Sequence, residues 1–327
     1  MMENLKFTVS STPHIRANNS VDDIMLDVIL ALMPAAFVGV YYFGARALAI
    51  ILVSVISCVL FEYLYQKIAR KKVTINDLSA VVTGMLLAFV LPVTVPYYDV
   101  VIGAFVAIVI TKQLFGGIGH NFMNPALIGR AFLLASFPVA LTKFTNLRLG
   151  ITEKIADVVT SATPLSDNPD ALPTFTEQLL GKFSNGMPIG GCIGETCIAA
   201  ILLGGAYLVI RRVISLRIPL SYLITMVVMA LLFKGRVDIF GGNTLGAVFS
   251  GGVCFGAFFM ATDYVTTPTT RLGQIIFGVG CGFLTSVIRF WGGYPEGVTY
   301  AILFMNVLTP LIDKWIKPKA FGFVKNA

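Results

Sequence analysis

The sequence predicts an all-α polytopic membrane protein with about ten transmembrane helices in two inverted five-helix repeats. Hydrophobic residues make up 56% of the 327 residues and charged residues 13%, against about 25% charged residues in a soluble domain. Several apolar runs approach the roughly 20 residues that cross a bilayer. Basic residues gather in short clusters between these runs, as they do at the cytoplasmic ends of membrane helices.

Apolar runs on either side of one long polar interval predict the individual helices. Five runs precede the interval, at about 24–43, 46–66, 78–92, 98–115 and 123–137. Five follow it, at about 193–211, 218–234, 245–262, 272–290 and 298–314. The third helix is short because Pro92 and Pro96 close its run, and proline interrupts helical hydrogen bonding.

A weak internal sequence repeat divides the chain into two halves. Residues 109–117 and 287–293 both place a cation, an aromatic residue and two glycines at a helix end. Since each half holds an odd number of helices, the halves are expected to be inverted in the membrane. The expected segments are a cytoplasmic N-terminal segment (1–23), a first repeat (24–138), an exterior loop (139–192), a second repeat (193–314) and a cytoplasmic tail (315–327).

The distribution of basic residues predicts the orientation. The net charge is +7, and the densest clusters lie at 67–72, at 211–217 and after residue 313. These clusters alternate with sparser connections, so both termini are expected on the cytoplasmic side of the inner membrane. The long interval then faces outward, and the partner of the basic residues is the lipid bilayer rather than nucleic acid.

The exterior interval contains a run of small polar residues, Thr160 to Thr163, followed by Pro164. Such a run favours an exposed turn whose hydroxyl groups a modifying enzyme can reach. Asp157 would bind a metal or orient the attached group, whereas an ordinary solvated loop is the alternative interpretation.

The run Asp157-x-x-Thr160-Ser161-Ala162-Thr163 resembles the flavinylation motif Asp-x-x-Ser-Gly-Ala-Thr. Residues 120–132, 261–270 and 296–306 add further matches. Together they resemble the RnfD/NqrB family, whose members are membrane components of the Rnf ion-translocating electron-transport complex and of the sodium-pumping NADH:quinone reductase. The resemblance covers nearly the whole chain, and the short N-terminal segment favours the Rnf branch.

The resemblance implies FMN attached to Thr163 through a phosphoester by a flavin transferase, with Asp157, Thr160, Ser161 and Ala162 forming the recognition motif. It also implies a second, non-covalent flavin, riboflavin, within the helical bundle. The chain departs from the motif at two positions: Thr160 keeps the hydroxyl group, and Ser161 restricts a backbone that glycine leaves free. We still expect flavinylation.

The resemblance also implies a function. The chain would belong to a ferredoxin:NAD oxidoreductase that passes electrons through FMN and couples their flow to Na⁺ or H⁺ translocation. It would act with a second flavin-carrying subunit and iron–sulfur subunits, and not alone.

Polar residues within the helices are further candidates, because ionisable groups inside a membrane are expensive. Asn124, Arg130 and Asp263 are candidate cofactor-binding residues. For Arg130 the alternative is a structural ion pair with a carboxylate, such as Glu62 or Asp263. Lys112 and Arg289 close equivalent helices and are expected to reach the membrane interface.

The sequence offers neither a catalytic residue nor a metal site, since His14 and His120 are isolated from one another. The main alternative function is a channel or permease of the urea- or ammonium-transporter kind, which uses ten helices in two inverted halves and carries no flavin. A structural anchor for redox partners is a third. The threonine motif favours the flavoprotein.

Overall fold

The computed structural model describes residues 20–145, 149–150, 174–182, 189–233, 244–292 and 297–317. Most of these residues are helical, and an antiparallel β-bridge joins Pro92 to Cys192. The predicted flavinylation motif, Asp157, Thr160, Ser161, Ala162 and Thr163, lies outside the described residues.

The helices follow the predicted runs closely. Those before the long interval are α1 (Val21–Phe43), α2 (Ala45–Ile68), η1 (Ile75–Asp77), α3 (Ser79–Phe89), α4 (Tyr97–Phe105), η2 (Val106–Gln113), α5 (Pro125–Ser136) and α6 (Pro138–Leu141). Those within and after it are α7 (Phe175–Leu180), α8 (Ile198–Ile210), α9 (Arg217–Leu232), α11 (Thr244–Phe249), α12 (Val253–Phe255), η6 (Gly256–Met260), α13 (Arg271–Trp291) and α14 (Val298–Trp315).

Two predicted helices are less regular than expected. The run at 98–115 begins as α4 and becomes the π-helix η2. The run at 245–262 is divided into α11, α12 and the π-helix η6. A π-helix widens the turn by one residue, so it re-aims the side chains beyond it.

The length and composition of the helices identify a membrane protein. Among the described residues, three helices, α1, α2 and α13, are long and apolar enough to cross a bilayer. Large apolar side chains such as Phe37 and Leu52 are 68% and 50% exposed on the outer faces of α1 and α2. Exposed apolar surface on this scale requires lipid or protein to cover it.

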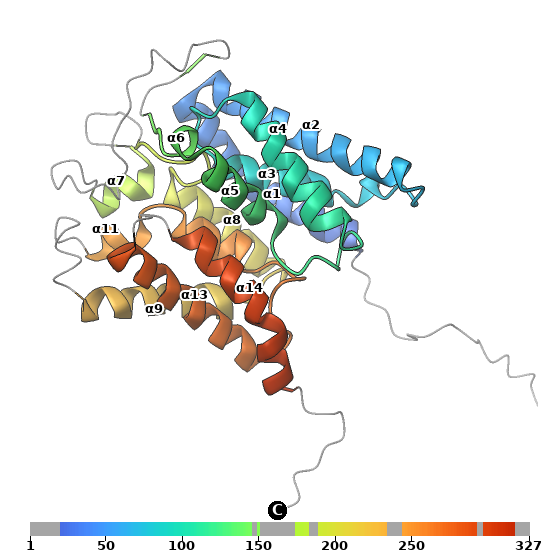
Figure 1. Ribbon diagram of the computed structural model, residues 1–327. Helices are drawn as coiled ribbons and strands as arrows, with labels where there is room; N and C mark the ends of the chain where they lie inside the picture. Colours follow the sequence, from blue (N-terminus) through green and yellow to red (C-terminus); the bar gives the residue numbers. More distant parts are fainter. Residues whose placement is uncertain are drawn as a thin grey trace, which may run out of the picture.

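Figure 1 shows α2 and α4 on one side of the molecule and α9, α13 and α14 on the other, with α5 and α8 between them. In the first half α2 packs on α3 and α4, and in the second half α9 packs on α13 and α11. The two halves meet where α1 contacts α8 and α5 contacts α14. These contacts form an interface between the two halves, and a ligand-binding site can lie at such an interface.

Helix α3 ends inside the protein. Its 11 residues extend about 16 Å at 1.5 Å per residue, well short of a bilayer. The segment before α8 completes its hydrogen bonding: the Ile193 N–H donates to the Leu91 carbonyl at 3.1 Å, and the Gly194 N–H donates to the Phe89 carbonyl at 2.9 Å. Gly194 is required there, because a Cβ would lie 2.5 Å from the Phe89 Cβ. Irregular backbone at this depth is stable because protein surrounds it.

Candidate functional site

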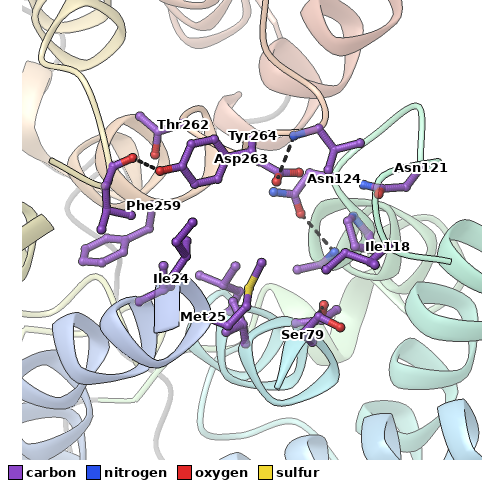
Figure 2. A pocket seen from close by; sticks show the side chains of 18 of the residues that line it. Ile24, Met25, Ser79, Ile118, Asn121, Asn124, Phe259, Thr262, Asp263 and Tyr264 are labelled. Atoms are coloured by element: carbon purple, nitrogen blue, oxygen red, sulfur yellow. Dashed lines mark hydrogen bonds between the residues drawn. The ribbon is translucent and has the colours of Figure 1, made fainter. Parts of the chain in front are cut away.

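A pocket lies between the N-terminal ends of α1, α3 and α5 and the turn that follows η6 (Figure 2). It contains about 810 Å³ of space between atoms, including its opening to solvent. Apolar side chains line most of it: Ile24, Met25, Val28, Val82, Leu86, Ile118, Pro125, Ala126, Leu208, Val213, Ile214, Phe258, Phe259 and Val265. The polar and amphipathic lining residues are Ser79, Thr83, Lys112, Asn121, Asn124, Thr262, Asp263 and Tyr264.

Asn124 reaches the pocket because it is the N-cap of α5. Its side-chain oxygen accepts hydrogen bonds from the N–H groups of Ala126 at 3.0 Å and Leu127 at 3.3 Å, and Pro125 fills the first helical position. Its amide nitrogen donates to the Met260 carbonyl across the interface at 3.4 Å. Asn124 therefore joins the two halves of the molecule at the pocket wall.

Asp263 approaches the pocket from the other half, in the turn after η6. Its carboxylate accepts hydrogen bonds from the Val265 N–H at 3.5 Å and from the Thr266 hydroxyl at 3.3 Å. Burial raises the pKa of the Asp263 carboxyl, and these two hydrogen bonds oppose the rise. The Tyr264 hydroxyl donates to the Val213 carbonyl and so ties this turn to the end of α8.

Lys112 forms part of the opposite wall together with Ser79. Its Nζ lies 2.8 Å from Glu62 Oε2 and 2.6 Å from Ser79 Oγ. The expectation that Lys112 and Arg289 reach the membrane interface is wrong, because they are 3% and 5% exposed. The carboxylate of Glu62 holds Lys112 inside, and the Ser250 carbonyl accepts a 3.0 Å hydrogen bond from Arg289.

Arg130 does not line the pocket. Its Nη1 lies 3.6 Å from Glu195 Oε1, and its Nη2 lies 3.6 Å from the Cys192 sulfur. The alternative interpretation, a structural ion pair with a carboxylate, is thus confirmed, but the partner is Glu195 rather than Glu62 or Asp263, because α5 directs this side chain toward the segment before α8. The structure brings Asn124 and Asp263 together and places Arg130 in a separate ion pair between α5 and that segment.

Several lining residues were not predicted from the sequence. Asn121 lies in the stretch that resembles the family, so this signal was available. Lys112 was expected at the membrane interface rather than in a site, and Ser79 gave no signal, because both look like the ordinary polar ends of apolar runs. No group of three or more potential metal ligands of the His, Cys, Asp and Glu types occurs among the residues with described positions.

The pocket combines apolar walls with hydrogen-bonding groups on two sides. Figure 2 shows Ser79 of α3 and Asp263 of the turn after η6 on opposite sides of it. Mostly apolar walls with a few convergent polar groups are typical of small-molecule and cofactor sites. The arrangement suits a small molecule that has both apolar surface and a few polar groups.

Comparison with known proteins places the chain in a family. The model of the NQR2, RnfD, RnfE family matches residues 8–322. The chain is 48% identical to the D subunit of the Na(+)-translocating ferredoxin:NAD(+) oxidoreductase complex of Acetobacterium woodii, over 99% of this chain and 98% of that protein. It is 46% identical to the proton-translocating counterpart of Clostridium ljungdahlii, over 97% and 96%. It is 34% identical to the D subunit of the ion-translocating oxidoreductase complex of Escherichia coli, over 98% and 99%. The chain therefore belongs to the NQR2, RnfD, RnfE family.

Proposed function

We propose that the chain is the membrane flavoprotein subunit of an ion-translocating ferredoxin:NAD oxidoreductase complex. It passes electrons through FMN bound covalently at Thr163 and takes part in coupling their flow to Na⁺ or H⁺ movement. The observation that carries the proposal is similarity along almost the entire chain to two subunits of such complexes. Those two relatives are named for different ions, so similarity favours neither ion.

The flavinylation motif supports the covalent site. Thr163 keeps the hydroxyl group that a phosphoester needs, and Asp157 keeps the carboxylate of the motif. The bound flavin supplies the one- and two-electron chemistry. The chain's own contribution is attachment on the exterior face, where an untethered cofactor would be lost.

The pocket supports a second, non-covalent flavin such as riboflavin. Phe258, Phe259 and Met25 supply apolar surface for the ring faces, while Asn121 and Asp263 supply polar groups for the ring edge. The residues present thus fit the group. They would bind and orient it at the contact between the two halves of the molecule.

The basic clusters of the sequence support a ten-helix arrangement in the inner membrane with both termini cytoplasmic, and helix packing supports its division into two similar halves. The packing of α2 on α3 and α4 has a counterpart in the packing of α9 on α11 and α13. In this arrangement the pocket opens near the cytoplasmic side and the 139–192 segment faces outward. The partners are the remaining subunits of the complex, including a second flavin-carrying subunit and iron–sulfur subunits, and the flavin transferase.

Mass spectrometry of the purified subunit tests the covalent site. We expect co-expression with a flavin transferase to add the mass of an FMN residue to the peptide that contains Thr163. The Thr163→Ala variant lacks the addition, and denaturation of either protein releases the non-covalent flavin. An unmodified Thr163 beside an active transferase would overturn the assignment and favour the permease, for which solute flux in vesicles is the assay.

A further inference from the structure

The Glu62–Lys112 pair forms a buried charge cluster behind one wall of the pocket. The two side chains are 1% and 3% exposed, and Lys112 Nζ contacts both carboxylate oxygens of Glu62, at 3.0 and 2.8 Å. Burying two charges costs free energy that a single contact rarely returns. Such a pair suggests a role beyond stability.

The Glu62–Lys112 pair is oriented with its lysine toward the pocket. Lys112 lines the pocket and Glu62 does not. Gln113 Nε2 donates to Glu62 Oε1 at 2.8 Å, and Gln66 Nε2 donates to the same oxygen at 3.4 Å. Two glutamine side chains thus hold the carboxylate behind Lys112, and the positive end of the pair faces the pocket.

Ser79, which lines the pocket, extends the hydrogen-bond network of Lys112. Its hydroxyl accepts from Lys112 Nζ at 2.6 Å and donates to Asp77 Oδ1, also at 2.6 Å. Asp77 is half-buried and Lys112 is buried, so the Lys112 ammonium is held in place by carboxylate and hydroxyl groups. The other charged group at the pocket is Asp263, which approaches from the opposite side.

We propose that Lys112 is a positioning residue that sets the reduction potential of the flavin in this pocket, and that Glu62 limits its effect. The inference rests on the proposed non-covalent flavin site. A cation at the wall stabilises the more negative redox state of a bound ligand, which is its reduced state. The effect is strong because the surroundings are poorly polarisable and salt screens buried charges weakly.

The inference predicts shifts of opposite sign for the two partners. Lys112→Gln removes the positive charge and lowers the potential of the flavin. Glu62→Gln leaves the Lys112 charge uncompensated and raises it. We expect each change to shift the ratio of oxidised to reduced flavin about tenfold, which equals about 30 mV for a two-electron couple. The double variant lies between the two.

The test is a spectroelectrochemical titration of the full chain in detergent. All variants carry Thr163→Ala, so that the covalent flavin is absent, and riboflavin is added where purification removes it. Arg289→Gln is the matched control, because it also removes a buried cation but lies outside the pocket lining, and it leaves the potential unchanged. If Lys112→Gln does not fold, Glu62→Gln and the double variant still give the sign.

The outcomes separate this inference from the function on which it rests. Opposite shifts for the two single variants support it. Unchanged potentials, or shifts of the same sign, while riboflavin stays bound would overturn the role of Lys112 and leave the flavin site standing. A chain with Lys112 intact that neither retains nor takes up riboflavin would overturn both.

Discussion

Charged side chains inside this protein meet partners from distant parts of the sequence. Asp27 of α1 binds Arg211 and Tyr207 at the end of α8, with a 3.1 Å ion pair and a 2.8 Å hydrogen bond. Arg130 and Glu195 form a second such link. Each pairing lowers the cost of burying a charge, and each joins elements that the chain separates by many residues.

The Arg130–Glu195 pair predicts non-additive stability effects. Arg130→Met leaves the Glu195 carboxylate buried opposite an apolar side chain, which is expected to cost about 3–5 kcal/mol of unfolding free energy. Adding Glu195→Gln removes the stranded charge, so the double variant loses less than the first change alone. Denaturant unfolding in detergent measures both. Additive losses would show that the 3.6 Å contact contributes little.

Asp263 predicts a pH-dependent stability difference. Burial raises the pKa of its carboxyl in the folded state above the value of about 3.9 for an unfolded chain. The folded state then holds the proton more tightly, and its stability falls as pH rises from the unfolded pKa through the folded pKa. The Asp263→Asn variant does not titrate at this position, so its stability relative to the unchanged protein rises over the same window.

Thermal unfolding of the two proteins between pH 4 and pH 8 measures this difference. Asp22→Asn makes the same charge change on the exposed first turn of α1 and serves as the control. A stability difference between the Asp263→Asn variant and the unchanged protein that stays constant with pH would contradict the prediction.

Helix packing in this protein depends on close backbone contacts at glycine. At the crossing of α1 and α8, a Cβ on Gly204 would overlap the Ala31 carbonyl oxygen and would lie 3.0 Å from the Phe259 ring. Small residues at such crossings let membrane helices pack on one another. This crossing joins the two halves, so it supports one wall of the pocket.

Gly204→Ala is therefore expected to destabilise the protein by about 1–3 kcal/mol, because α8 must move away from α1. Gly191→Ala is the matched control, since nothing lies within 4 Å of the Cβ it would gain. Thermal unfolding in detergent compares the two. Equal melting temperatures would show that the crossing opens without cost.

The whole molecule predicts a defined orientation in the membrane. The basic clusters after α2, after α8 and beyond α14 are expected on the cytoplasmic side. A green fluorescent protein fused after residue 327 should then be fluorescent, and alkaline phosphatase fused after residue 143 should be active. The opposite pattern would reverse the orientation and place Thr163 inside the cell.

The sequence by itself determined the helical class, the approximate extent of most helices and the family. Apolar runs of bilayer length and basic clusters are local properties of the sequence, so they can be identified without knowing the tertiary structure. The motif at Thr163 is local as well, and it stands as a prediction from the sequence.

Only the tertiary structure decided which polar groups meet. Asn124 and Asp263 come from different halves yet share one pocket, Arg130 turns to Glu195, and Lys112 is drawn inside by Glu62. The early end of α3 also depends on a neighbouring segment, because Ile193 and Gly194 complete its hydrogen bonds. The physical reason is common to all: a buried charge or unpaired backbone group is stable only beside its partner, and the fold alone sets that distance.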